Sequence, residues 1–307
     1  MVYDRAVNPV THLPATESLG RGVIIICIGL SLAAFSGALM KLLGNQISVI
    51  QVAWFRFAGM SLLLLPFLLW RYRLAALRPA RPWVQILRGM TLAAATTLFV
   101  KGSQTVDYAD AIAILYAYPF LLVIVASLIL GEKAGWSVWI GVIGGFAGVL
   151  LVMRPEFDQV NTGTFLILAC AAVISVQLAL NRKLGQVSPP LITAFAGAVC
   201  ATVVLSLLLP GQWQVVPASA WPWIALLVLS GTINQTLLVL AFVYADASTL
   251  APFTYVEIVA AVILGFLFFG TLPSLLSWAG ILLILSLIHI SEPTRRRLES
   301  RFAGAGV

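Results

Sequence analysis

Residues 108–132 read YADAIAILYAYPFLLVIVASLILGE, and residues 244–271 read YADASTLAPFTYVEIVAAVILGFLFFGT. Each stretch opens with the tetrapeptide Tyr-Ala-Asp-Ala and continues as an apolar run that reaches a glycine. Each run is long enough for a helix that crosses a bilayer, because such a helix needs about 20 apolar residues. The two stretches therefore predict a membrane-spanning unit that occurs twice in the chain.

Three further pairs extend the repeat at a constant offset of 139 residues: Gly131 with Gly270, Trp139 with Trp278, and Gly141 with Gly280. The tetrapeptides themselves are offset by 136 residues, so a three-residue insertion lies between them and the later pairs. Four matches in the same order favour a duplication over chance similarity in an apolar chain.

The composition excludes most soluble classes of protein. Hydrophobic residues make up 61% of the 307 residues, charged residues only 9%, and the mean hydropathy is +1.03. A soluble globular protein is about 45–50% apolar and about 25% charged. An ordinary soluble enzyme, a disordered protein and a nucleic-acid binder are excluded, although the net charge is +7. We therefore expect a multi-spanning membrane protein whose basic residues set its topology.

Hydropathy, with breaks at polar, Gly and Pro clusters, predicts ten spans: 22–43, 47–70, 82–102, 108–130, 134–153, 163–183, 190–209, 221–244, 248–270 and 274–290. Five spans fall in each copy, at 22–153 and 163–290, after a polar tail at 1–21. Because five is odd, the second copy enters from the opposite face. The expected fold is all-α and integral to the membrane, with ten transmembrane helices in two inverted five-helix repeats.

Basic residues orient the predicted bundle. With a cytoplasmic N-terminus, nine basic residues lie on the inner side: Arg5, Arg21, Arg71, Arg73, Arg78, Arg81, Lys133, Arg182 and Lys183. Only Lys41, Lys101 and Arg154 lie on the outer side. The positive-inside rule then predicts that both termini are cytoplasmic. The tail at 291–307 is left out of this count. The run LSLIHISEPTR at 285–295 departs from the repeat, and we interpret it as a translated sequencing-library adapter.

No recognised catalytic or metal-binding motif occurs in the chain. Cys27, Cys170 and Cys200 each lie in an apolar run without CxxC spacing, and the only histidines are His12 and His289. This pattern predicts neither a metal site nor a cofactor. The alternative to a transporter is an integral-membrane enzyme that modifies lipid. Such an enzyme needs clustered His, Asp, Glu or Cys residues at a membrane face, whereas the acidic residues here are dispersed.

A family resemblance is carried by motifs in both halves: Gln51 to Arg56, Leu87 to Gly89, Ala109 to Ala111, Tyr118 to Phe120, Leu130 to Glu132, Ala251 to Tyr255, and Gly265 to Gly270. In this order the chain resembles the drug/metabolite transporter superfamily, specifically proteins with two EamA domains. It is most similar to a bacterial subgroup that includes S-adenosylmethionine uptake carriers. One departure is Thr271, which stands where the first copy has Glu132.

The resemblance implies a secondary carrier of small organic metabolites in the bacterial inner membrane, with a small-molecule substrate, the lipid bilayer as its surroundings and no nucleic-acid partner. Inverted repeats of this kind work by alternating access around a site between the halves. The substrate, the direction of transport and the coupling ion stay open.

Three charged residues lie within predicted spans, where a charge costs roughly 2.5–3.5 kcal/mol on insertion scales. Arg88 is close to the cytoplasmic end of its span, so we expect it to snorkel to the interface. Arg56 lies roughly 13 Å deep at 1.5 Å per residue, and Glu257 lies near the middle of its span. Arg56 and Glu257 either form a structural ion pair or face a wet central cavity.

Further polar side chains at depth complete the predicted substrate site. Asn234 and Gln235 add amides to the eighth span, and Tyr116, Tyr118 and Tyr255 lie too deep to be interface anchors. The predicted site residues are Arg56, Tyr116, Tyr118, Asn234, Gln235, Tyr255 and Glu257, and Glu257 is the candidate carrier of a coupling proton. Pro119 and Pro252 are predicted hinges, because proline removes a backbone hydrogen bond.

Two overlapping GxxxG spacings in the fifth span, Gly141 with Gly145 and Gly144 with Gly148, predict close helix packing. That packing serves either the monomer or a homodimer, and the sequence leaves both open.

Overall fold

A computed structural model describes residues 15–73, 81–130, 136–153, 161–185, 189–244 and 250–283. All regular structure in these ranges is helical, as the sequence predicts. The helices are α1 (Ala15–Gly44), α2 (Val49–Tyr72), α3 (Pro82–Ser103), α4 (Tyr108–Leu115), α5 (Tyr118–Leu130), α6 (Trp136–Met153), α7 (Thr162–Gly185), α8 (Pro190–Leu208), α9 (Trp221–Tyr244) and α11 (Val256–Phe269), with the short helices η2 (Ala218–Ala220) and η3 (Ala251–Tyr255) and a final helix at 275–283.

The described residues contain seven helical segments that are long and apolar enough to cross a membrane, and shorter apolar helices at 142–152 and 253–269. The ten predicted spans fall on these helices, with α4 and α5 together forming the fourth span and η3 and α11 the ninth. Only the first part of the tenth span, 275–283, is described. The polar N-terminal tail up to residue 14 and the proposed adapter run lie outside the described residues.

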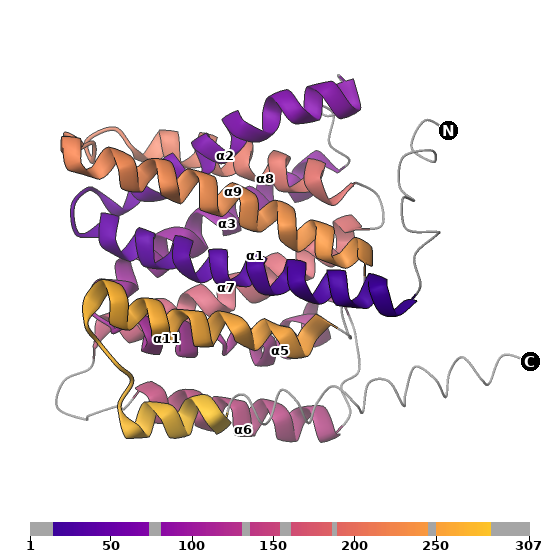
Figure 1. Cartoon of the computed structure of the whole chain (residues 1–307), viewed down its shortest axis with the longest axis vertical. Coiled ribbons are helices and arrows are strands. Elements are labelled where there is room, and N and C mark those ends of the chain that lie inside the picture. The colour runs from indigo at the N-terminus through magenta and orange to yellow at the C-terminus, as the bar shows by residue number, and fades with distance from the viewer. Residues whose placement is uncertain are drawn as a thin grey trace, which may run out of the picture.

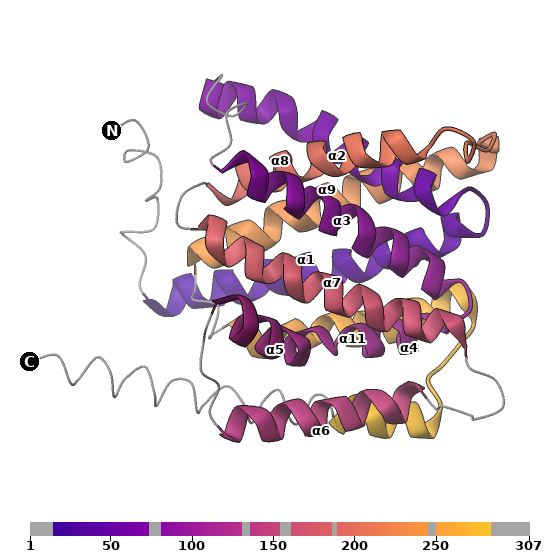
Figure 2. The same ribbon diagram turned by 180° about the vertical axis from the view of Figure 1, so that it is seen from behind.

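The two halves of the chain form one bundle and share its core. Helix α1 packs against α9 and α11, and α3 packs against α7 and α8, so the largest contacts join the first half to the second. Figure 1 shows α9, α1 and α11 side by side on one face, and Figure 2 shows α8, α3 and α7 on the other. Any space enclosed between these layers is therefore lined by both halves.

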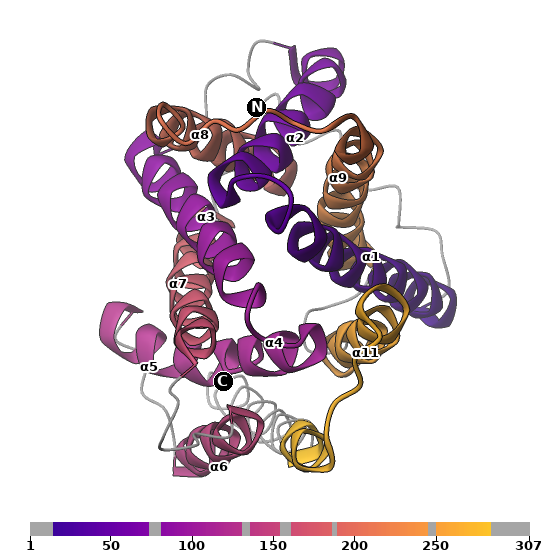
Figure 3. The same cartoon turned by 90° about the vertical axis from the view of Figure 1, so that its left-hand side faces the viewer.

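Helix α6 and the helix at 275–283 lie together at one edge of the bundle (Figure 3). An ideal Cβ atom on Gly280 would lie 2.7 Å from the Gly148 carbonyl oxygen and 2.6 Å from Val152 Cγ2. The absence of a side chain at Gly280 is therefore what allows the two helices to approach. One of the glycine pairs in the fifth span thus serves packing within the monomer.

The expectation that Arg88 snorkels is wrong. Its side chain is only 5% exposed, and it links α3 to both α7 and α8. Arg88 Nε donates to Asn181 Oδ1 at 2.5 Å, and Nη1 donates to the Thr193 carbonyl oxygen at 2.7 Å. Gly197 on α8 leaves the room for the guanidinium, which a Cβ atom there would meet. The position of Arg88 along its span does not show that the neighbouring helices α7 and α8 offer hydrogen-bond acceptors to it.

Candidate functional site

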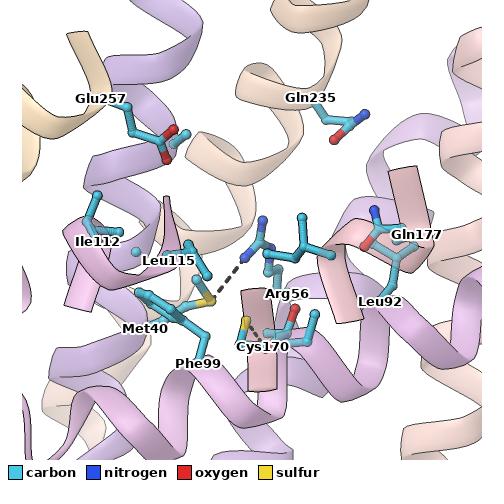
Figure 4. A pocket seen from close by; sticks show the side chains of 15 residues that line it. Met40, Arg56, Leu92, Phe99, Ile112, Leu115, Cys170, Gln177, Gln235 and Glu257 are labelled. Carbon is cyan, nitrogen blue, oxygen red and sulfur yellow. Dashed lines mark hydrogen bonds between the residues drawn. The ribbon is translucent and has the colours of Figure 1, made fainter. Parts of the chain in front are cut away.

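A cavity of ≈ 230 Å³ lies between the two halves of the chain. Helices α1, α2, α3 and α4 line it from the first half, and α7, α9 and α11 from the second. Its polar lining residues are Arg56, Thr96, Cys170, Gln177, Gln235 and Glu257. Three of the seven predicted site residues therefore face one cavity: Arg56, Gln235 and Glu257 (Figure 4).

Arg56 projects from α2 into the middle of this cavity (Figure 4). Its Nη1 atom donates to Met40 Sδ at 3.0 Å, and a thioether sulfur is a weak acceptor. Within the described residues no carboxylate lies within 4.0 Å of the guanidinium. Gly231 on α9 faces the same side chain, since a Cβ atom there would lie 3.8 Å from Arg56 Nε. Most donors of Arg56 are therefore left for another partner.

Glu257 sits in the first turn of α11 and is held by the first half of the chain. The Tyr116 hydroxyl oxygen lies 2.9 Å from Glu257 Oε2 and 2.7 Å from the Thr254 carbonyl oxygen. Tyr116 is 2% exposed, whereas Glu257 is half-buried because it lines the cavity. The ion pair between Arg56 and Glu257, which the sequence left open, does not form: Arg56 donates to Met40, and Glu257 is hydrogen-bonded to Tyr116.

The other four predicted site residues do not line the cavity. Tyr116 is hydrogen-bonded to Glu257. The Tyr118 ring packs at a tilt against the Tyr116 ring, with 5.7 Å between the ring centroids. Tyr255 packs against the main hydrophobic core, and Asn234 is 5% exposed. Tyr116 thus lies next to the site, and it contacts the segment that contains its repeat mate Tyr255.

Pro119 lies in the first turn of α5, directly after a break in its span, and Pro252 lies in a 3-10 helix. The fourth span breaks into α4 and α5 at residues 116–117, just before Pro119, and the Tyr118 carbonyl accepts a hydrogen bond from Ser175 Oγ at 2.9 Å. Pro252 lies in the 3-10 helix η3, which turns into α11 at Val256. At the repeat offset of 139, the break at 116–117 corresponds to 255–256. The two copies of this span are therefore interrupted at equivalent positions beside the cavity.

Several lining residues were missed by the sequence reasoning. Gln177 on α7 is an amide within an apolar span, so the same argument that found Gln235 would have found it. Met40 and Cys170 resemble ordinary core residues in the sequence, and only the packing places them here. The Cys170 thiol donates to the Ala95 carbonyl oxygen at 3.1 Å.

A second hollow, of ≈ 490 Å³, lies at the ends of α1, α2 and α3 beside the loop at 212–214. None of the predicted site residues lines it. The loop is tied to α2 there, since Gln51 Nε2 donates to the Gln214 carbonyl oxygen at 2.8 Å and the Gln214 amide donates back to Gln51 Oε1 at 3.1 Å.

The central cavity therefore combines a guanidinium and a carboxylate, which form no ion pair within 4.0 Å, with apolar walls from Met40, Phe99, Ile112 and Leu115. Such a site suits a small molecule with charged groups at more than one point.

Known proteins that are similar to this chain include several membrane transporters. The EamA-like transporter family matches the chain twice, over residues 20–154 and 161–290. The S-adenosylmethionine uptake transporter of Rickettsia prowazekii (strain Madrid E) is 28% identical over 273 residues, which cover 88% of this chain and 92% of that protein. The riboflavin transporter of Rhizobium johnstonii is 31% identical over 240 residues, which cover 77% of this chain and 78% of the relative.

A pseudopaline exporter of Pseudomonas aeruginosa is 24% identical over 286 residues and covers 90% of this chain and 98% of its own. A solved crystal structure superposes with a TM-score of 0.61 at 19% identity, covering 92% of this chain and 99% of that one. That likeness supports the fold. The double family match over nearly the whole chain, with the transporters among its relatives, leads to one assignment: the chain belongs to the EamA-like transporter family of the drug/metabolite transporter superfamily, and it is a membrane transporter and not an enzyme.

Proposed function

We propose that this transporter is a secondary active carrier of amino-acid-like or related zwitterionic metabolites, and that it works by alternating access across the bacterial inner membrane. One observation carries the proposal: Arg56 and Glu257 line the same cavity between the halves without forming an ion pair. A buried charge without an ion-pair partner is costly, and in a membrane span it commonly marks a substrate or ion pathway.

The substrate class follows from the charges of the site. Arg56 offers unused guanidinium donors to a carboxylate, and guanidinium–carboxylate pairs are strong and directional. Glu257 offers its second carboxylate oxygen to an ammonium group. A molecule that carries both groups satisfies both side chains at once, which a purely anionic or cationic solute does not. S-Adenosylmethionine, the molecule in the name of the Rickettsia relatives, carries both groups.

Proton coupling is supported by the contacts of Tyr116. A hydroxyl has a single hydrogen, and a carbonyl oxygen only accepts. The contacts to Thr254 and Glu257 are therefore both full hydrogen bonds when Tyr116 donates to the carbonyl and a protonated Glu257 donates to Tyr116. When Glu257 is charged, one of the two bonds is lost. Loss or gain of a proton at Glu257 would thus rearrange the contact between η3 and α4.

The rest of the proposed organisation follows the sequence. The two repeats extend over 22–153 and 163–290 in inverted orientation, both termini are cytoplasmic, and the carrier is a monomer or a homodimer. Irregular backbone at equivalent points of the two copies supports motion about the pseudo-two-fold axis, with Pro119 and Pro252 as hinges.

The test is transport by the purified protein in proteoliposomes. Vesicles preloaded with unlabelled S-adenosylmethionine, riboflavin or methionine are diluted into the same compound in labelled form. A carrier concentrates the label transiently inside by exchange, and empty liposomes do not. The proposal expects exchange of a zwitterion and faster net movement when a proton gradient is imposed. Exchange of riboflavin alone, or flux without exchange, as in a channel, would contradict it.

A further inference from the structure

Two carboxamides line the central cavity on the side away from Glu257. Gln177 projects from α7 and Gln235 from α9, and both are half-buried (Figure 4). In the part of the chain that the structure describes, neither side chain makes a hydrogen bond to another residue. Gln51 and Gln104, which lie outside this cavity, are hydrogen-bonded: Gln51 Nε2 donates to the Gln214 carbonyl oxygen, and Gln104 Nε2 donates to that of Gly44. Gln85 on α3 is buried without a partner in the described residues, but it does not line the cavity.

Unused polar groups at this depth favour a ligand. A carboxamide has two donor hydrogens and an acceptor oxygen. Withdrawing such a group from water without a hydrogen-bond partner costs free energy. The carboxamide also presents a donor and an acceptor side by side in one plane. This pair matches a planar edge that offers the complementary acceptor and donor, which is how Gln pairs with the edge of adenine.

We propose that Gln177 and Gln235 form a hydrogen-bonding half of the substrate site, which recognises the planar donor–acceptor edge of a carboxamide or nitrogen heterocycle. The substrate is then a zwitterion that carries such a group. The proposal rests on the proposed function, because Arg56 and Glu257 hold the charged end while the two glutamines select what is attached to it. Figure 4 shows Arg56 between Glu257 and Gln177, so the charged and amide parts of the site adjoin.

Three probes separate the contributions. Methionine is a zwitterion with a thioether in place of a planar edge. Glutamine has about the same length and carries a carboxamide, and S-adenosylmethionine extends methionine by an adenine base. Affinities of the purified protein are measured for all three, in the wild type and in Gln177→Met and Gln235→Met. Methionine as the replacement keeps the length of the side chain and removes its donor and acceptor.

In the wild type we expect glutamine, S-adenosylmethionine or both to bind about tenfold more tightly than methionine, in line with one bidentate amide contact. A preference for glutamine alone identifies a carboxamide as the group recognised, and a preference for S-adenosylmethionine alone identifies the heterocycle. In each variant the preference over methionine falls to less than about threefold, because the replacement removes the donor and acceptor of the amide and leaves Arg56 and Glu257 in place.

Equal wild-type affinities for the three probes would overturn the inference and leave the proposed function in place. A preference that survives both substitutions would overturn it too. Equal weakening of all three probes in a variant would contradict it as well, since that result indicates general damage to the site. If the wild type binds none of the three, both the inference and the proposed substrate class fail.

Discussion

At the residue scale, the Tyr116 hydroxyl is the one group of the first half, among the described residues, that forms a hydrogen bond with the Glu257 carboxylate. Tyr116→Phe removes that hydroxyl and keeps the ring that stacks on Tyr118. We expect the rate of proton-driven uptake to fall about fivefold, which corresponds to the loss of one hydrogen bond of about 1 kcal/mol. Uptake is measured in proteoliposomes as a function of pH. An unchanged rate and pH profile would show that Tyr116 plays no part in the function of Glu257.

Arg88 gives a contrasting prediction, because its guanidinium is engaged in structure. Arg88→Met leaves Asn181 Oδ1 and the Thr193 carbonyl oxygen without their donor. We expect the free energy of unfolding to fall by about 1–3 kcal/mol, the cost of unsatisfied buried polar groups. Thermal unfolding in detergent measures it, with the exposed Lys101→Met as the control. Equal stability of the two variants would contradict the structural role.

Side-chain type and depth predicted part of the site at this scale. Arg56, Gln235 and Glu257 were identified because a charge or amide deep in an apolar span needs an explanation, and all three line the cavity. The same signal gave a wrong expectation for Arg88 and included Asn234, which does not line the cavity, because it reports depth and not the direction of a side chain around its helix. Met40 and Cys170 carry no such signal and required the packing of seven helices.

At the element scale, the fourth span is broken between α4, which lines the cavity, and α5, of which no residue lines it. Pro119→Ala restores a backbone N–H that can bond the carbonyl of Leu115, a lining residue, and so favours one continuous helix. We expect a thermal midpoint equal to or above that of the wild type, together with slower exchange of substrate. The two measurements are made on the same preparation. Full exchange activity in a stable Pro119→Ala protein would remove Pro119 from the proposed hinges.

The repeat was readable at this scale because it needs only spacing. The break in the ninth span could not be predicted in the same detail. Pro252 indicates roughly where the helix is interrupted, but it does not predict the 3-10 geometry of η3. The GxxxG spacings predict that another helix packs closely, but they do not identify that helix. In the structure it is the helix at 275–283 in the second repeat, which carries Gly280. A pattern along one helix does not specify the neighbour that it meets.

At the scale of the whole molecule, orientation is predicted by nine basic residues on one side against three on the other. Single cysteines are placed at positions 76 and 214, in a protein whose three native cysteines are replaced. Gln214 is exposed, and Ala76 lies outside the described residues. We expect a membrane-impermeant maleimide to label Gln214→Cys in intact cells and Ala76→Cys only after permeabilisation. The reverse pattern would invert the topology.

The two halves of the bundle share one cavity, and each half supplies one charged side chain to it. Arg56 comes from the first repeat and Glu257 from the second, so relative motion of the repeats changes the separation of the two groups. A carrier that alternates between two faces needs such a coupling between its binding site and its global shape.

The measurement that tests this account most directly is substrate exchange in proteoliposomes by Arg56→Met, Glu257→Gln and the lipid-facing control Leu229→Val, whose side chain is 46% exposed in the wild type. All three proteins are first matched for yield and thermal midpoint. The account predicts exchange of the zwitterion at the wild-type rate in the control, at least about tenfold slower exchange in Arg56→Met, and loss of proton-driven uptake in Glu257→Gln. Wild-type exchange and an unchanged pH dependence in well-folded Arg56→Met and Glu257→Gln proteins would contradict it.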